Sequence, residues 1–166
     1  MKVDDKHFYH GAAVMQIAED RHFTAINPLQ INGSICHNGF LINTNIVVYP
    51  KYAAKPKGRH KEYQFTFKEE NRAELAQIAQ HHPHLFISLV CVHDREICCL
   101  TYQQFRDLHE RRLNDVGHEE EQFVVLVTLP EGKKFRVYVN ASGTRGKYLG
   151  KQILVARSCF PAVLFD

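Results

Sequence analysis

The feature that most constrains the fold is an apolar run, Leu85-Phe-Ile-Ser-Leu-Val-Cys-Val92. It contains β-branched and aromatic side chains and no proline or glycine, which is typical of a strand covered on both faces. The polar residues 93–96 indicate a turn, and a second apolar run, Ile97-Cys-Cys-Leu100, follows. We therefore predict a central strand at 85–92 that pairs antiparallel with 97–100, with other elements covering both faces.

Hydrophobic periodicity and turn residues predict the other elements. Asp5 is the expected N-cap of a first helix, Asn32-Gly33 favours a hairpin turn, and Thr101-Tyr-Gln-Gln104 is a capping box. In chain order we expect a helix at 5–21, strands at 23–30 and 35–49 (the latter split by a turn at 43–45), an exposed loop at 50–61, a strand at 62–68, a helix at 69–80, the strand pair described above, a helix from 101 to about 113, and strands at 123–129, 133–139 and 153–156.

This element order predicts an α/β (α+β) fold with a mixed central sheet in the order α-β-β-β-α-β, followed by a C-terminal hairpin. The chain has 166 residues, of which 45% are hydrophobic and 23% are charged, as in an ordinary globular protein. We expect residues 1–166 to form a single domain, because this length suffices to bury a sizeable core.

The cysteines and the chain start bear on the compartment. Five cysteines are an odd number, and Cys98 and Cys99 are neighbours on a predicted strand, so their side chains should point to opposite faces. We expect reduced, mostly buried thiols. No stretch approaches the roughly 18 apolar residues that span a bilayer, and residues 1–6 are too charged for a signal peptide. We therefore expect a cytoplasmic protein with no membrane partner.

The predicted element order resembles the restriction-endonuclease-like core of PD-(D/E)XK nucleases. The chain is also similar, over nearly its whole length, to an uncharacterised family of bacterial proteins, which implies no activity. The residues that carry this second resemblance are His10-Gly-Ala-Ala13, Phe23-Thr-Ala-Ile-Asn27, Ile42-Asn43, Lys51-Tyr52, Phe65-Thr-Phe67, Leu89-Val-Cys91, Ile97-Cys98 and Phe160-Pro161.

The nuclease resemblance implies a set of Mg²⁺ ligands. Such enzymes take one acid from the second strand and another from two residues before a lysine on the third, because oxygen ligands suit this hard cation. At the second-strand position the sequence has Asn43 or Asn45, and Tyr49 stands two residues before Lys51. Amides and a phenol replace the carboxylates, so the motif is degenerate.

A second placement of the motif uses Glu62-Tyr63-Gln64, where the acid is present but glutamine replaces the lysine. Glu19 or Asp20 of the first helix is then the source of a further carboxylate. If the protein is a nuclease, we expect Glu62, Gln64 and Asp20 to be catalytic with Mg²⁺ as cofactor; otherwise we expect no cofactor.

The net charge is +3, and its distribution is uneven. Residues 51–61 and 133–157 contain no acid and hold more than half of the 21 lysines and arginines. If both lie on one side, they form a surface for nucleic acid, DNA or RNA, with Tyr52, Tyr63, Tyr138 and Tyr148 as stacking partners. The expected binding residues are Lys51, Lys55, Lys57, Arg59, Lys61, Arg145, Lys147 and Lys151.

Other classes of function remain open from the sequence. Eleven histidines are present, but the paired short spacings typical of zinc ligands are missing, so we expect no metal site. A protein-interaction module, including a homodimer that pairs through an exposed strand edge, is an alternative. The sequence leaves undecided whether the protein is an enzyme, and the preferred function is nucleic-acid binding without catalysis.

Overall fold

The longest apolar run forms β5 (His84–Cys91), as predicted, in a computed structural model that describes residues 1–143 and 146–166. β5 pairs in parallel with β3 (Ile46–Ala53) and antiparallel with β6 (Glu96–Thr101). Its side chains from Ile87 to Cys91 are all buried. The first sheet has the strand order β1-β2-β3-β5-β6, so β5 is its fourth strand rather than its middle one.

The N-terminal part of this sheet is a meander. β1 (Ile26–Ile31) and β2 (Ser34–Ile42) are joined at Asn32 and Gly33, whose φ values of 49° and 80° suit the predicted two-residue hairpin turn. β2 continues antiparallel into β3 through the turn predicted at 43–45. The chain then returns to the same sheet as β5 through a crossover, which produces the mixed sheet.

The predicted loop at 50–61 is wrong at its start, because β3 continues through Ala53. Pro50 therefore lies inside a strand, although proline usually argues against one. β2 pairs with β3 only as far as Val48, whereas β5 pairs along the whole of β3. From Tyr49 onward β3 has a neighbour on one side only, and such an edge tolerates a residue without an N–H donor.

Three helices cover the sheets: α1 (Asp5–Glu19), α2 (Glu69–His81) and α3 (Tyr102–Val116). The N-cap of α1 is Asp4, not the predicted Asp5, because Asp4 is the acid three residues before His7. The Asp4 carboxylate accepts from the His7 N–H at 3.0 Å, and the His7 ring accepts from the Asp4 N–H at 3.0 Å. The predicted capping box of α3 is confirmed, with the Thr101 hydroxyl accepting from the Gln104 N–H.

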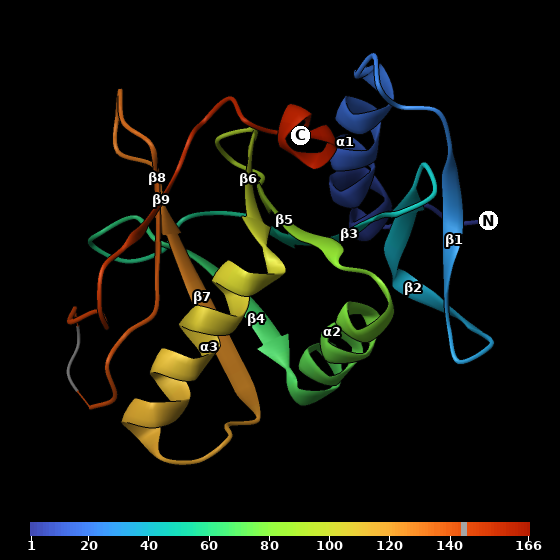
Figure 1. Ribbon diagram of the computed structural model, residues 1–166. Helices are drawn as coiled ribbons and strands as arrows, with labels where there is room; N and C mark the ends of the chain where they lie inside the picture. Colours follow the sequence, from blue (N-terminus) through green and yellow to red (C-terminus); the bar gives the residue numbers. More distant parts are fainter. Residues whose placement is uncertain (144–145) are drawn as a thin grey trace.

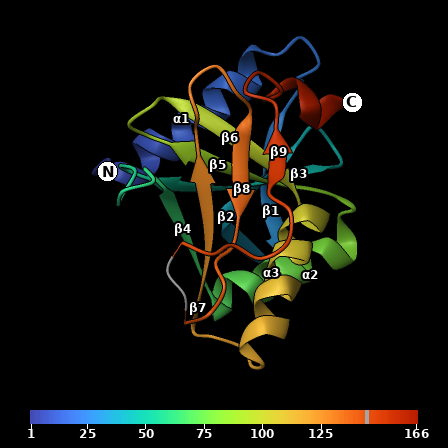
Figure 2. The same ribbon diagram turned by 90° about the vertical axis from the view of Figure 1, so that its left-hand side faces the viewer.

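The predicted C-terminal hairpin is confirmed, because residues 126–128 pair antiparallel with 136–138, but it is part of a larger second sheet that is antiparallel throughout. This sheet contains β4 (Tyr63–Lys68), β7 (Gln122–Thr128), β8 (Phe135–Tyr138) and β9 (Ile153–Val155), in that order (Figure 2). The period of two in β4 correctly marks Tyr63, Phe65 and Phe67 as its buried face. The sequence pattern does not show that its partner is β7, about sixty residues later.

The two sheets and the helices form layers, which supports the predicted mixed α/β class. α1 and the C-terminal turn Ala162–Phe165 lie on one side of the first sheet, and α2 and α3 lie on the other with the second sheet (Figure 1). Cys98 belongs to the core on the second side and Cys99 to the core beneath α1, as the strand alternation predicts. No helix in the described part of the chain is both long and apolar enough to cross a membrane.

Candidate nucleic-acid interface

The two basic segments border one cavity of about 790 Å³, which we call the interloop cavity. His60 and Lys61 line it from the first segment, and Arg136, Gly146 and Tyr148 line it from the second. The segments approach closely: a Cβ placed on Gly146 would lie 4.0 Å from the Nε2 atom of His60. Segments separated by more than seventy residues in sequence are thus brought to one place.

The first segment is shaped by a small turn rather than by an irregular loop. Lys57 and Glu62 form an isolated β-bridge, in which the Lys57 N–H donates to the Glu62 carbonyl at 2.8 Å and the Glu62 N–H donates back at 3.0 Å. Gly58 and Lys61 supply the positive φ values, 74° and 51°, that the tight reversal between them requires. The turn holds Lys57, Arg59 and Lys61 in exposed positions.

The second segment is held to α3 by hydrogen bonds. Asn140 and Tyr148 form another isolated bridge. The Arg112 guanidinium donates to the Asn140 carbonyl at 2.9 Å, and the Asp115 carboxylate accepts from the Ser142 N–H at 2.7 Å. That backbone hydrogen bond is the main cause of a lowered pKa at Asp115. These contacts position Lys147, which is exposed.

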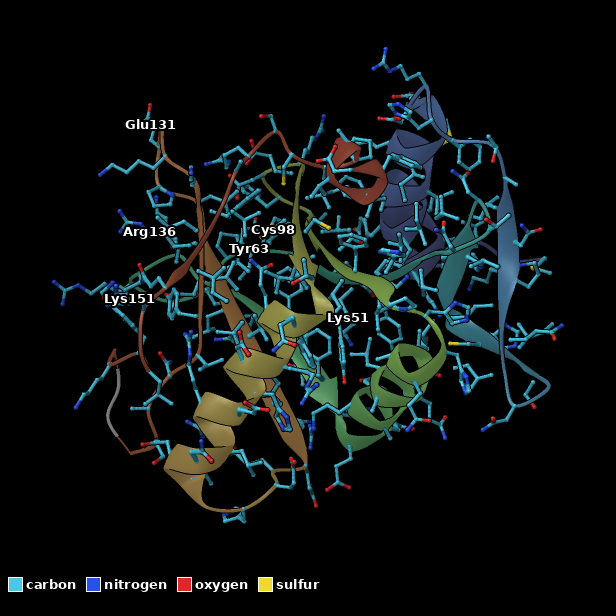
Figure 3. All side chains as sticks on the ribbon, in the orientation of Figure 1. Lys51, Tyr63, Cys98, Glu131, Arg136 and Lys151 are labelled. Carbon is cyan, nitrogen blue, oxygen red and sulfur yellow. The ribbon has the colours of Figure 1, made fainter. Side chains whose placement is uncertain are left out.

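The exposed cations around the cavity are not neutralised locally. The ion pairs in the described part of the chain, taken at an N–O distance of up to 4.0 Å, involve other side chains. In Figure 3, Arg136 and Lys151 lie toward the same edge of the molecule. Among the residues expected to bind nucleic acid, those that are exposed and take part in no such pair are Lys55, Lys57, Arg59, Lys61, Lys147 and Lys151. Arg145, also expected to bind, lies outside the described residues.

Three carboxylate residues line the cavity: Glu131 is exposed, and the other two are bound to tyrosines. The Tyr138 hydroxyl donates to Glu62, and the Tyr63 hydroxyl donates to Asp94. Burial, and then the bond to the carboxylate, raises the pKa of both tyrosines. Their phenols are therefore neutral donors at physiological pH. These acids offset part of the positive charge of the two basic segments. The cavity wall is therefore mixed in charge.

The stacking partners expected from the sequence are only partly available. The rings of Tyr63 and Tyr138 are buried, at 0% and 6% exposure; Tyr63 lies on the face of the second sheet that packs into the core, and Tyr138 lies on the opposite face. Tyr148 is 46% exposed and packs on Tyr138 with ring centroids 5.6 Å apart. Tyr52 is exposed but lies against Tyr9 and His10, away from this cavity.

Lys51 does not belong to the exposed surface on which it was expected. It is a half-buried residue of β3 with its Nζ atom 5.2 Å from the centroid of the Phe67 ring. Figure 3 places it in the body of the molecule, far from Lys151. Lys51 lines a second cavity, of about 450 Å³, together with Gln64.

The candidate catalytic residues do not line one cavity. Glu62 lines the interloop cavity, Gln64 lines the second cavity, and Asp20 caps the end of α1, where it accepts from the His22 N–H at 2.8 Å. Asn43 has a structural part: its side-chain oxygen accepts from the Thr24 N–H at 2.7 Å. Within residues 1–143 and 146–166, no three His, Cys, Asp or Glu side chains are grouped so as to hold a metal ion.

The structure adds residues that sequence reasoning missed. Lys6 of α1 and Asn38 of β2 stand beside Lys51 in the second cavity. The sequence suggests Tyr49 and Lys51 as one position of the nuclease motif. Nothing in the sequence shows that α1 and β2 also contribute residues to the cavity around Lys51.

The chain has a mixed α/β fold with two sheets, and its two basic segments meet at one cavity. Comparison with family models, curated proteins and solved structures finds no significant match to this chain.

Proposed function

We propose that this protein binds nucleic acid through the basic rim, meaning Lys55, Lys57, Arg59, Lys61, Lys147 and Lys151. The observation that carries the proposal is the meeting of two basic segments, distant in sequence, at one cavity; within residues 1–143 and 146–166, the exposed cations of these segments form no ion pair. Lysine and arginine side chains that are not paired within the protein release counterions from phosphates when they bind.

The geometry favours contact with the phosphate backbone over base reading. The rim cations lie on a tight turn and on a loop that is hydrogen-bonded to α3. Proteins that read bases in the major groove insert an α-helix or a two-stranded β-ribbon, and the rim cations lie on neither. Exposed Tyr148 offers one ring for a base. The expected ligand is therefore a flexible or single-stranded nucleic acid, held largely without regard to sequence.

Fluorescence anisotropy with labelled single- and double-stranded DNA and RNA tests the proposal. The variant is Lys57→Glu with Lys147→Glu, one change in each segment, and the matched control is Lys2→Glu with Arg21→Glu. All four residues are exposed, and both pairs change the net charge equally. For the parent, log K should fall linearly with log salt between roughly 50 and roughly 200 mM.

Loss of about two phosphate contacts should reduce that slope by about 1.4 to 1.8 in the Lys57/Lys147 variant, and the control should keep the parent slope. Equal weakening in the variant and the control would show a response to net charge alone. That result, or no binding by the parent at low salt, would remove the proposal and favour the protein-interaction alternative.

A further inference from the structure

A second cavity, which the proposed function does not use, lies where α1, β2, β3 and β4 meet. We call it the α1–β3 pocket; it has a volume of about 450 Å³. Its wall includes Lys6, His10, Asn38, Tyr49 and Lys51. Two lysines and a histidine thus face one space, and no carboxylate is among the lining residues.

Lys51 is the principal cation of the α1–β3 pocket, and it is uncompensated. No carboxylate in the described part of the chain lies within 4.0 Å of its ammonium group. Burial lowers the pKa of Lys51, and the charges of Lys68 and Lys6 lower it further. Burying an ammonium group is unfavourable unless an opposite charge accompanies it. An anion bound in the pocket would therefore supply the counter-charge that no lining residue provides.

Lys6 and His10 line the same cavity. The Lys6 ammonium group donates to the Asn38 side-chain oxygen at 3.2 Å and to the His37 carbonyl at 3.3 Å, which holds it at the mouth of the pocket. The Nδ1 atom of His10 is buried and has no hydrogen-bond partner. Burial, followed by the charges of Lys6 and Lys51, lowers the pKa of His10 to about 4.

Glu74 is hydrogen-bonded to two residues of the pocket wall. Glu74 of α2 accepts from the Tyr49 hydroxyl at 2.7 Å and from the Asn38 amide at 3.0 Å, both on the same oxygen. The Asn71 amide donates in turn to the Tyr49 hydroxyl at 3.3 Å. This network orients Asn38 and Tyr49, while the Glu74 carboxylate lines a different hollow and leaves Lys51 unpaired.

We propose that the α1–β3 pocket binds a phosphate group, with Lys51 as the charge partner and Lys6 and His10 as further donors. Two ammonium groups, with a neutral imidazole beside them, match a dianionic phosphate better than a singly charged carboxylate. Phosphate of this kind comes from free inorganic phosphate or from the terminal phosphate of a nucleotide strand. For a strand end, the paired rings of Tyr9 and Tyr52, 4.9 Å apart, form a rim on which a base can stack.

The site is separate from the basic rim, so its test does not depend on the proposed function. Radiolabelled inorganic phosphate is measured by equilibrium dialysis against the parent chain, Lys51→Met and the matched control Lys2→Met. We expect Lys51→Met to weaken phosphate binding at least about tenfold, because a charge-assisted hydrogen bond is lost from a partly desolvated site. The Lys2→Met protein should bind phosphate within about twofold of the parent, because that lysine is exposed and lines neither cavity.

Two additional measurements keep the test decisive. Nuclear magnetic resonance titration of the parent should shift the Lys51 and His10 side-chain signals on phosphate addition, and this readout needs no variant to fold. Competition by an oligonucleotide with and without a 5′-phosphate separates the two sources: preference for the phosphorylated strand assigns a strand end, and indifference assigns free phosphate.

Three results would overturn the phosphate site. They are equal affinity of Lys51→Met and Lys2→Met, unchanged signals of Lys51 and His10, and no phosphate binding by the parent up to on the order of 10 mM. Loss of phosphate binding together with intact nucleic-acid binding would leave the basic rim as a separate function, so the two proposals fail independently.

Discussion

Replacing Lys51 with methionine should make the phosphate-free protein more stable, although it removes a charge and a contact. Methionine keeps the unbranched apolar stem beside Phe67 and removes the unpaired ammonium group. Replacing buried ionic groups by apolar ones of similar size stabilises by up to about 1 to 4 kcal/mol. We expect the low end, about 1 kcal/mol, because Lys51 is only half-buried and a cation–π contact worth about 0.5 to 1 kcal/mol is lost.

The pH dependence of this effect has a definite sign. The pKa of Lys51 is lowered in the folded state, so the unfolded chain binds this proton more tightly and the parent gains stability as pH rises through the folded pKa. The advantage of Lys51→Met should therefore be complete below the folded pKa. It should decline as pH rises toward 10.5, the ordinary value for a lysine.

Thermal unfolding followed by circular dichroism measures both effects. In phosphate-free buffer, Lys51→Met should unfold about 2 to 4 °C above the parent. At a hundredfold excess of phosphate over its Kd, the parent should gain about 2.7 kcal/mol, or about 5 to 10 °C, and the variant should gain far less. Ionic strength is held constant, and Lys2→Met serves as the control. The reasoning would be refuted if Lys51→Met were less stable than the parent. It would also be refuted if phosphate raised the unfolding temperature of Lys51→Met as much as that of the parent.

Two further predictions concern the rim and its support. Tyr148→Ala should weaken binding of single-stranded nucleic acid by about 1 to 3 kcal/mol and leave duplex binding nearly unchanged, because only an unpaired base can stack on this exposed ring; anisotropy titrations with both ligands decide this, and equal losses would contradict it. Glu120→Gln should destabilise the fold by about 1 kcal/mol, because Glu120 accepts from Arg112 at 2.7 and 3.0 Å and this partner lowers the pKa of Glu120. The loss of stability should be present above pH 4.5, the ordinary glutamate value, and should disappear as pH falls through the lowered pKa of Glu120. Urea unfolding at several pH values measures this loss. A loss that persists in acid would argue against the ion pair.

The sequence predicted those elements whose causes are local. The β5–β6 pair follows from two apolar runs around a polar turn, and α3 follows from a capping box whose partners are three residues apart. The Asn32-Gly33 turn is equally local, because those two residues adopt the positive φ that the hairpin needs. In each case the interaction that forms the element lies within a few residues of chain.

The errors arose where distant segments decide the outcome. The pairing of β4 with β7 depends on which apolar faces meet in space, and the alternation in β4 records only that one face is buried. Pro50 suggested a loop. Proline is acceptable in β3 because the pairing of β2 with β3 stops at Val48. Lys51 was grouped with the loop lysines for the same reason, and the pocket around it became visible only when α1 and β2 were in place.

The position of β4 links the folding of the two sheets. β4 lies within the crossover that joins β3 to β5 in the first sheet, yet its hydrogen bonds are to β7 in the second. If β7 detaches, β4 becomes an unpaired segment whose buried aromatic residues Tyr63, Phe65 and Phe67 lose part of their cover. Opening of the second sheet therefore strains the crossover of the first. Amide hydrogens of β4 and β5 should then exchange through a common opening event, as one cooperative unit.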